Sequence, residues 1–129
     1  MHMPEPDPGV IARKGKLVAR LRKVLSRDAV IDNPAETRAY ECDALTAYSC
    51  PPLAVILPGS TREVSQALAI CHEMGVPVVP RGSGTSLAGG ALPTADSVIL
   101  GVARMNEVLE TDYDNRVIRV QTGRTNLSV

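Results

Sequence analysis

The chain has 129 residues, and its 14 basic and 14 acidic side chains give a formal charge of zero. This balance and an aromatic content of only 2% argue against a general nucleic-acid binder, which carries a basic excess or aromatic platforms for bases. The longest apolar runs are much too short to span a membrane, and the length suits one modest domain.

The three cysteines, Cys42, Cys50 and Cys71, are odd in number and lack CxxC spacing, so neither a disulfide framework nor a zinc site is indicated. Cys71 is followed by His72 and Glu73, but neighbouring helical residues point in different directions. We therefore expect a buried thiol beside a solvated pair, no metal site, and a reducing cytoplasm as the location.

Residues 1–27 are predicted to form an N-terminal tail and a basic amphipathic helix. The tail, residues 1–8, is acidic and rich in proline, and it should be extended or disordered. From Val10 to Leu25 apolar residues recur at helical spacing. The same segment contains many basic residues and no acidic residue. We interpret them as one solvated helix face, with a transit peptide or an anion-binding segment as alternatives.

Residues 28–129 are predicted to form one domain that contains a βαβ unit. A short helix comes first, with Asn33 as its cap and Pro34 in its first turn. A continuous apolar run, residues 53–57, is typical of a strand that is buried on both faces. Residues 76–79 form a second short strand, which we expect to be parallel to the first and its direct neighbour.

A helix should connect these two strands. Ser60 and Glu63 have the spacing of a capping box, and Gly75 is placed to end the helix. Its buried face is predicted from the helical period and comprises Val64, Ala67, Leu68, Cys71 and Met74.

The C-terminal part of the sequence predicts further β-structure. Residues 97–101 should add a third parallel strand, and residues 107–121 alternate apolar and polar on both sides of a turn near Asp114 and Asn115. The last residues, TNLSV, look like the start of a helix. The fold class is therefore α+β: a small parallel three-stranded sheet with flanking helices, plus a β-hairpin.

A glycine-rich loop, VVPRGSGTSLAGGALP in residues 78–93, follows the second strand. Glycines at the carboxyl end of a parallel strand let backbone N–H groups converge on an anion. A P-loop is not supported, because Gly90 and Ala91 replace its lysine and hydroxyl residue. A dinucleotide fingerprint fails because Leu87 stands where its third glycine belongs. The loop therefore predicts a diphosphate site, with a flexible linker as the alternative.

The segment PRGSGTSLAGGALP resembles the pyrophosphate loop of FAD-binding domains of the vanillyl-alcohol oxidase and p-cresol methylhydroxylase (PCMH) type. YECDALTAY, LAVILPGSTREV and VQTGRTNLSV are similar to the FAD-linked subunit of glycolate oxidase and to FAD-dependent D-lactate dehydrogenases. The resemblance covers residues 28–129 and implies a set of FAD contacts: Pro80, Arg81, Gly82, Ser83, Gly84, Thr85, Ser86, Gly89 and Gly90. Some relatives hold the flavin through a histidine where Thr85 stands, so the resemblance implies non-covalent FAD here.

Members of this group run to several hundred residues, with a second FAD-binding subdomain and a substrate cap. The resemblance therefore implies an N-terminal fragment of a flavin-dependent 2-hydroxy-acid oxidoreductase, with an incomplete first subdomain and no catalytic residues, inactive alone and weak in binding FAD. Expected partners are FAD, a small 2-hydroxy acid in the parent enzyme, and other oxidase subunits or a second copy. The expected location is the cytoplasm, or the inner face of the membrane through partner subunits. The alternative is a non-catalytic module that binds a diphosphate ligand or a partner chain.

Overall fold

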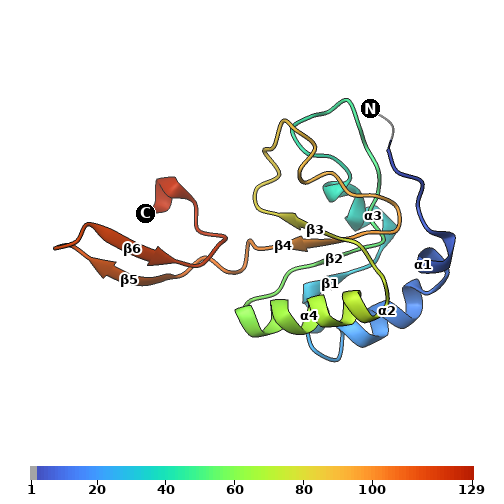
Figure 1. The fold of residues 1–129 in the computed structure, drawn as a ribbon, viewed down its shortest axis with the longest axis horizontal. Helices are drawn as coiled ribbons and strands as arrows, with labels where there is room; N and C mark the ends of the chain where they lie inside the picture. The colour runs from blue at the N-terminus through green and yellow to red at the C-terminus, as the bar shows by residue number, and fades with distance from the viewer. Residues whose placement is uncertain (1–2) are drawn as a thin grey trace.

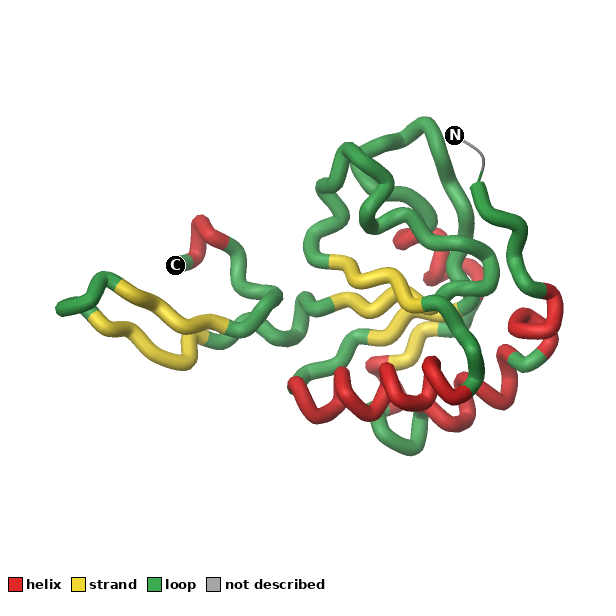
Figure 2. Tube along the Cα trace, viewed as in Figure 1, coloured by secondary structure: helices red, strands yellow, loops and turns green. Residues whose placement is uncertain are grey.

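The computed structural model describes residues 3–129 and shows a small four-stranded sheet, helices packed beside it and a β-hairpin that projects away (Figure 1). The two longer helices lie on one side of the strands, and long loops lie on the opposite side (Figure 2). Among the described residues, the structure contains no helix with the length and apolar character needed to cross a membrane.

The sheet has the strand order β1-β2-β4-β3. Its strands are β1 (Val30–Ile31), β2 (Ala54–Ile56), β3 (Val78–Arg81) and β4 (Val98–Gly101). The three predicted strands are confirmed, although β3 begins at Val78 rather than at Val76, and β4 pairs in parallel with both β2 and β3. Strand β1 pairs antiparallel with β2, and at two residues it is too short to show a sequence pattern.

The expectation that β2 and β3 are direct neighbours is wrong, because β4 lies between them. All four residues of β4 are buried, which suits a central strand. Strand β3 is only half-buried and contains Pro80, which has no N–H to offer a second neighbour, so it occupies the edge.

The N-terminal segment forms two short helices instead of one: α1 (Pro8–Ala12) and α2 (Lys14–Leu21), separated at Arg13. The prediction of an extended tail over residues 1–8 is therefore wrong at Pro8, which begins α1. Asp7 caps α1 by accepting from the N–H of Gly9, and Pro8 occupies the first turn, where its missing N–H is harmless. The predicted disorder at the very start, residues 1–2, lies outside the described residues.

Helices α3 (Pro34–Thr37) and α4 (Thr61–Glu73) begin as predicted, with Asn33 capping α3 and Ser60 capping α4. The capping box of α4 is displaced by one residue. Ser60 Oγ accepts from the N–H of Glu63 at 3.2 Å, but the carboxylate of Glu63 accepts from the N–H of Gly59 rather than from that of Ser60.

The core lies between the sheet and helices α2 and α4. Leu17 and Leu21 of α2 and Ala67 and Cys71 of α4 are at most 1% exposed. Burial raises the pKa of the Cys71 thiol to about 11, in accord with the predicted buried thiol beside an exposed His72 and Glu73.

One predicted core position on α4 is wrong. Leu68 is 43% exposed, and Ile70, at 7%, takes its place in the core. The two residues flank the apolar stripe of α4 at similar angular distances on opposite sides, since each residue advances the helix by about 100°. Periodicity alone cannot decide which flank is covered.

The predicted hairpin is confirmed as β5 (Val108–Asp112) and β6 (Val117–Val120), an antiparallel pair. Its turn is organised by Asp112, whose carboxylate accepts from the N–H and the side-chain amide of Asn115. The expected C-terminal helix is a single 3₁₀ turn, Asn126–Ser128.

Candidate functional site

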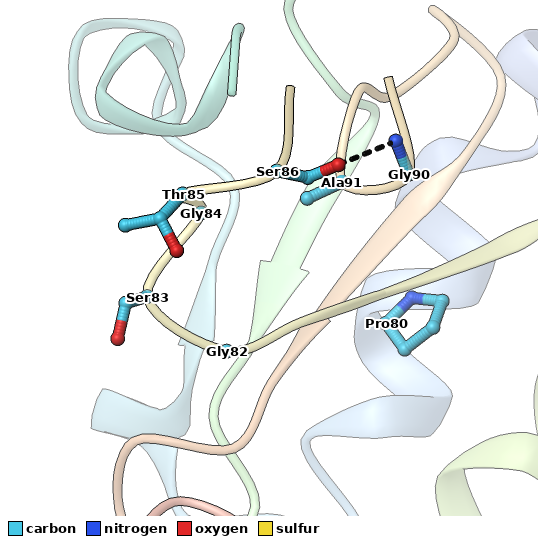
Figure 3. Close-up of a pocket in the computed structure, with 8 residues that line it drawn as sticks. All are labelled: Pro80, Gly82, Ser83, Gly84, Thr85, Ser86, Gly90 and Ala91. Atoms are coloured by element: carbon cyan, nitrogen blue, oxygen red, sulfur yellow. Dashed lines mark hydrogen bonds between the residues drawn. The ribbon is translucent and has the colours of Figure 1, made fainter. Parts of the chain in front are cut away.

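The glycine-rich loop leaves the carboxyl end of β3 and returns to the start of β4, and residues 82–97 contain no helix or strand. Its return path is buried at Ala91, Leu92 and Pro93. Its first half bends outward around an open hollow, with Gly82, Ser83 and Thr85 on one side and Gly90 and Ala91 on the other (Figure 3).

This hollow, which we call the loop hollow, has a volume of about 280 Å³. Most of the residues predicted as ligand contacts line it, joined by Ala91, which the sequence analysis did not single out. The lining residues are Pro80, Gly82, Ser83, Gly84, Thr85, Ser86, Gly90 and Ala91. Arg81 and Gly89 are the two predicted contacts that lie outside this lining.

The backbone amides in the first half of the loop are free. Within residues 3–129, none of the N–H groups of residues 82–86 donates a hydrogen bond to another protein group. The exposed hydroxyls of Ser83 and Thr85 accompany them. Five consecutive free N–H donors on a glycine-rich bend have the chemistry that binds an anionic group.

The hydroxyl of Ser86 contacts the loop itself. Its Oγ accepts from the N–H of Gly90 at 3.3 Å (Figure 3). The same oxygen accepts from the N–H of Ala88 at 3.2 Å, so Ser86 braces the loop from inside. Gly84 and Gly89 hold φ values of 71° and 76°, which a residue with a side chain rarely adopts.

Gly82 differs from Gly84 and Gly89 in its backbone conformation. Its φ is ordinary, and a Cβ added there would meet no protein atom within 4 Å. Neither backbone strain nor protein packing therefore requires glycine at this position, and the space in front of it is open.

Arg81 lies behind the loop. Its Nη1 donates to the carbonyl of Cys42 at 2.7 Å, and its guanidinium lies 5.6 Å from the centre of the Tyr40 ring. A Cβ on Gly84 would overlap that guanidinium. The contact of Arg81 with the diphosphate, which the resemblance implied, stays a prediction.

A second hollow of about 270 Å³ adjoins the first, because Gly82 and Ser83 line both. It also contains residues from the start and end of the hairpin region, namely Val102, Ala103, Thr122, Gly123, Arg124 and Thr125. Sequence reasoning missed this group as a site. The one available signal was the glycine in VQTGRT, and its meaning depends on a contact between segments that are far apart in sequence.

The electrostatics of the two hollows suit an anion. No acidic side chain is among their lining residues, and Arg124 lies in the second. Across residues 3–129, no three His, Cys, Asp or Glu side chains come together as a metal site would need.

The end of the loop is tied to the N-terminal segment through Asp96, which is 8% exposed. Its carboxylate accepts from the N–H of Asp7 at 2.9 Å and from the hydroxyl of Thr94 at 2.6 Å. Burial raises the pKa of Asp96, but these hydrogen bonds and one from its own backbone outweigh burial and hold the pKa below its ordinary value.

This arrangement makes the contribution of Asp96 to stability depend on pH. A depressed carboxyl pKa contributes stability above the unfolded pKa, near 4, and loses it as pH falls through the folded pKa. We expect Asp96→Asn to lower the free energy of unfolding by about 2 kcal/mol at pH 7. The difference should shrink at pH 3 and below, as measured by urea unfolding. An equal difference at both pH values would contradict this account.

A parallel sheet that presents free amides at its carboxyl edge has the architecture of domains that hold the diphosphate of a nucleotide cofactor. Residues 52–129 match the protein-family model described as FAD binding domain. Since the match covers more than half of the chain, the protein belongs to this family of FAD-binding domains.

Individual relatives agree with this result. The glycolate oxidase subunit GlcD of Escherichia coli (strain K12) is 45% identical over 100 residues, which are 78% of this chain and 20% of that protein. The D-lactate dehydrogenase of Archaeoglobus fulgidus is 40% identical over 91 residues, 67% of this chain and 20% of that protein. The chain thus spans about a fifth of the length of these curated relatives.

A solved structure of p-cresol methylhydroxylase with substrate bound shows the same fold. Its TM-score is 0.80 at 22% identity, and the matched part covers 95% of this chain and 24% of that one. The resemblance inferred from the loop sequence, and the PCMH-type fold that it implied, are therefore confirmed.

Proposed function

We propose that this chain is the FAD-binding portion of a flavin-dependent 2-hydroxy-acid oxidoreductase, and that the loop hollow receives the diphosphate of FAD. The free N–H groups of residues 82–86 are the observation that carries the proposal. The relatives named glycolate oxidase subunit and D-lactate dehydrogenase support the substrate class, since glycolate and D-lactate are both 2-hydroxy acids.

The residues present fit such a group. The amides of residues 82–86 and the hydroxyls of Ser83 and Thr85 would hold the diphosphate by donating hydrogen bonds to it. Gly84 and Gly89 give the loop its bend, and Ser86 with Gly90 keeps it closed. The second hollow, which shares Gly82 with the first, would hold a neighbouring part of the cofactor.

When bound, FAD would supply a flavin ring able to accept a hydride from the α-carbon of a 2-hydroxy acid. This chain contributes binding and orientation to that reaction, because neither lining contains a His, Asp, Glu, Cys, Lys or Tyr side chain that could exchange a proton with the substrate. We propose non-covalent attachment: Thr85 has no ring nitrogen, and His72 lies on α4 outside the lining of both hollows.

The assembly in which the chain works is also part of the proposal. One relative is named as a subunit of glycolate oxidase, so association with other oxidase subunits is a reasonable expectation for this chain. Exposed apolar side chains of the hairpin, Val108, Leu109, Tyr113 and Val117, offer surface for a second copy or another subunit. Cytoplasmic location, or attachment to the inner membrane face through such subunits, stays a prediction.

The contribution of the Thr85 hydroxyl can be measured separately. We expect Thr85→Ala to weaken binding of FAD or ADP by about 1–2 kcal/mol, near the lower end of the range for a hydrogen bond to a charged group, because the hydroxyl is exposed to water. Isothermal titration of the wild type and the variant measures the change, and Thr46→Ala, another exposed loop threonine, is the matched control. Unchanged affinity in Thr85→Ala would remove this hydroxyl from the proposed contacts.

The alternative function, a module that binds a diphosphate ligand or a partner chain without any redox parent, uses the same loop. The two are separated by ligand preference. Binding of FAD well above that of ADP favours a site that also contacts the flavin half, for which the second hollow provides space. Equal affinity for both would favour the simple diphosphate module.

A further inference from the structure

The guanidinium of Arg81 lies behind the glycine-rich loop, apart from both hollows. The residue ends strand β3, and its carbonyl accepts from the N–H of Val102, so its backbone is fixed by the sheet. It lines neither hollow. Its charge is instead directed to a segment about forty residues earlier in the sequence.

Three contacts define the position of this side chain. Nη1 donates to the Cys42 carbonyl at 2.7 Å, and the guanidinium lies over the Tyr40 ring. A Cβ built on Gly84 would come within 2.2 Å of Nη2 and 2.4 Å of Cζ, so the guanidinium packs directly against that glycine. Arginine suits this place because its planar group can stack on a ring and donate in a fixed direction at once.

The segment that Arg81 contacts is anchored by a buried side chain. Asp43, 4% exposed, follows Cys42 and accepts from the N–H of Leu45 at 2.9 Å through Oδ1. Its Oδ2 is buried with no hydrogen-bond partner among residues 3–129. Through its bond to Leu45, Asp43 fixes the backbone of the segment whose Cys42 carbonyl accepts from Arg81.

We propose that Arg81 is a positioning residue, which clamps Gly84 to the Tyr40–Cys42 segment and so holds the amides of residues 82–86 in their binding arrangement before a ligand arrives. This inference rests on the proposed function of the loop. A loop that is already ordered loses less conformational entropy on binding, so the clamp raises affinity without touching phosphate.

The position of the Arg81 guanidinium is a second reason for glycine at position 84. Its φ of 71° favours glycine, and the guanidinium occupies the place of any side chain. The end of an arginine can move away, but it would then leave the Cys42 carbonyl and release the loop.

Arg81→Lys provides the main test, because lysine keeps the charge but cannot both stack on Tyr40 and contact Gly84. In the ligand-free chain, ¹⁵N relaxation should show the order parameters of the residue 82–86 amides falling from about 0.85 to below about 0.6. ADP affinity should fall about tenfold, and its dependence on salt should match that of the wild type. A residue that touched phosphate would instead retain most affinity as lysine.

Tyr40→Leu is the second variant, since it removes the ring beneath the guanidinium without altering any residue that lines the hollows. It should loosen the same amides and weaken ADP binding several-fold. Arg62→Lys, an exposed position on α4, is the control and should change neither. Thermal unfolding of all variants verifies that the fold is retained.

Unchanged order parameters in both variants would overturn the clamp. So would an Arg81→Lys chain that keeps most of its ADP affinity, because that is the result expected of a residue that contacts phosphate directly. If the wild-type chain binds no ADP, the proposed function fails, but the order parameters of the free chain still decide the inference about Arg81.

Discussion

Gly82→Val is expected to weaken FAD binding by the chain at least tenfold while leaving the free energy of unfolding within about 0.5 kcal/mol of the wild type. The φ of Gly82 is ordinary, and an added Cβ meets nothing within 4 Å, so the folded chain accepts a side chain there. The valine would stand in the open space shared by the two hollows, where the account places the ligand. Fluorescence titration of FAD and urea unfolding measure the two effects.

Gly59→Val is the matched control, because Gly59 is also exposed, has an ordinary φ and would place its Cβ no closer than 3.9 Å to another atom. It should change neither binding nor stability. Gly84→Val and Gly89→Val would also abolish binding, but they force valine to a positive φ and destabilise the loop. Full affinity in Gly82→Val would show that the ligand does not occupy the loop hollow.

Gly123→Ala is expected to loosen the base of the hairpin, where Gly123 packs against residues 102–105 that follow β4. An added Cβ would lie 2.0 Å from the carbonyl oxygen of Val102 and 2.9 Å from that of Met105, and both atoms belong to the backbone and cannot step aside. The hydrogen bond of 2.7 Å from the N–H of Gly123 to the Met105 carbonyl should break. The cost should reach about 3 kcal/mol, at the upper end for an added methyl group.

Hydrogen exchange locates this effect. The amides of Gly123 and of β6 should lose protection in Gly123→Ala, while those of β2 and β4 keep theirs. Gly15→Ala is the control, because its Cβ meets nothing within 4 Å and alanine favours the helix. If the hairpin amides remain protected in Gly123→Ala, the close approach at Gly123 is not what holds the hairpin.

Local features of the fold were predictable wherever neighbouring residues decide them. The caps of α3 and α4, the apolar runs of β2 and β4 and the turn of the hairpin follow from short sequence patterns. The order of the strands does not, since it depends on which apolar strand is covered on both edges. The burial of Ile70 instead of Leu68 was likewise not predictable, because packing against other elements decides which of the two is covered.

The candidate site shows the same division. The glycines and hydroxyls of the loop could be recognised from their spacing, because backbone freedom and small size are local properties. The position of Arg81 depends on Tyr40 and Cys42, and the second hollow depends on residues 122–125 lying against residues 82–83. Contacts between such distant segments leave no periodic signal in one sequence.

The central claim is that the loop hollow binds the diphosphate of FAD, and a ¹⁵N-resolved NMR titration of the wild-type chain with ADP and with FAD tests it most directly. The account predicts that both ligands shift the amides of residues 82–86 and Gly90, and that FAD also shifts Gly123 and Thr125 of the second hollow. Gly82→Val should suppress these changes. Shifts gathered on another surface, or none up to ~10 mM ligand, where binding would be weaker than about −3 kcal/mol, would contradict the account.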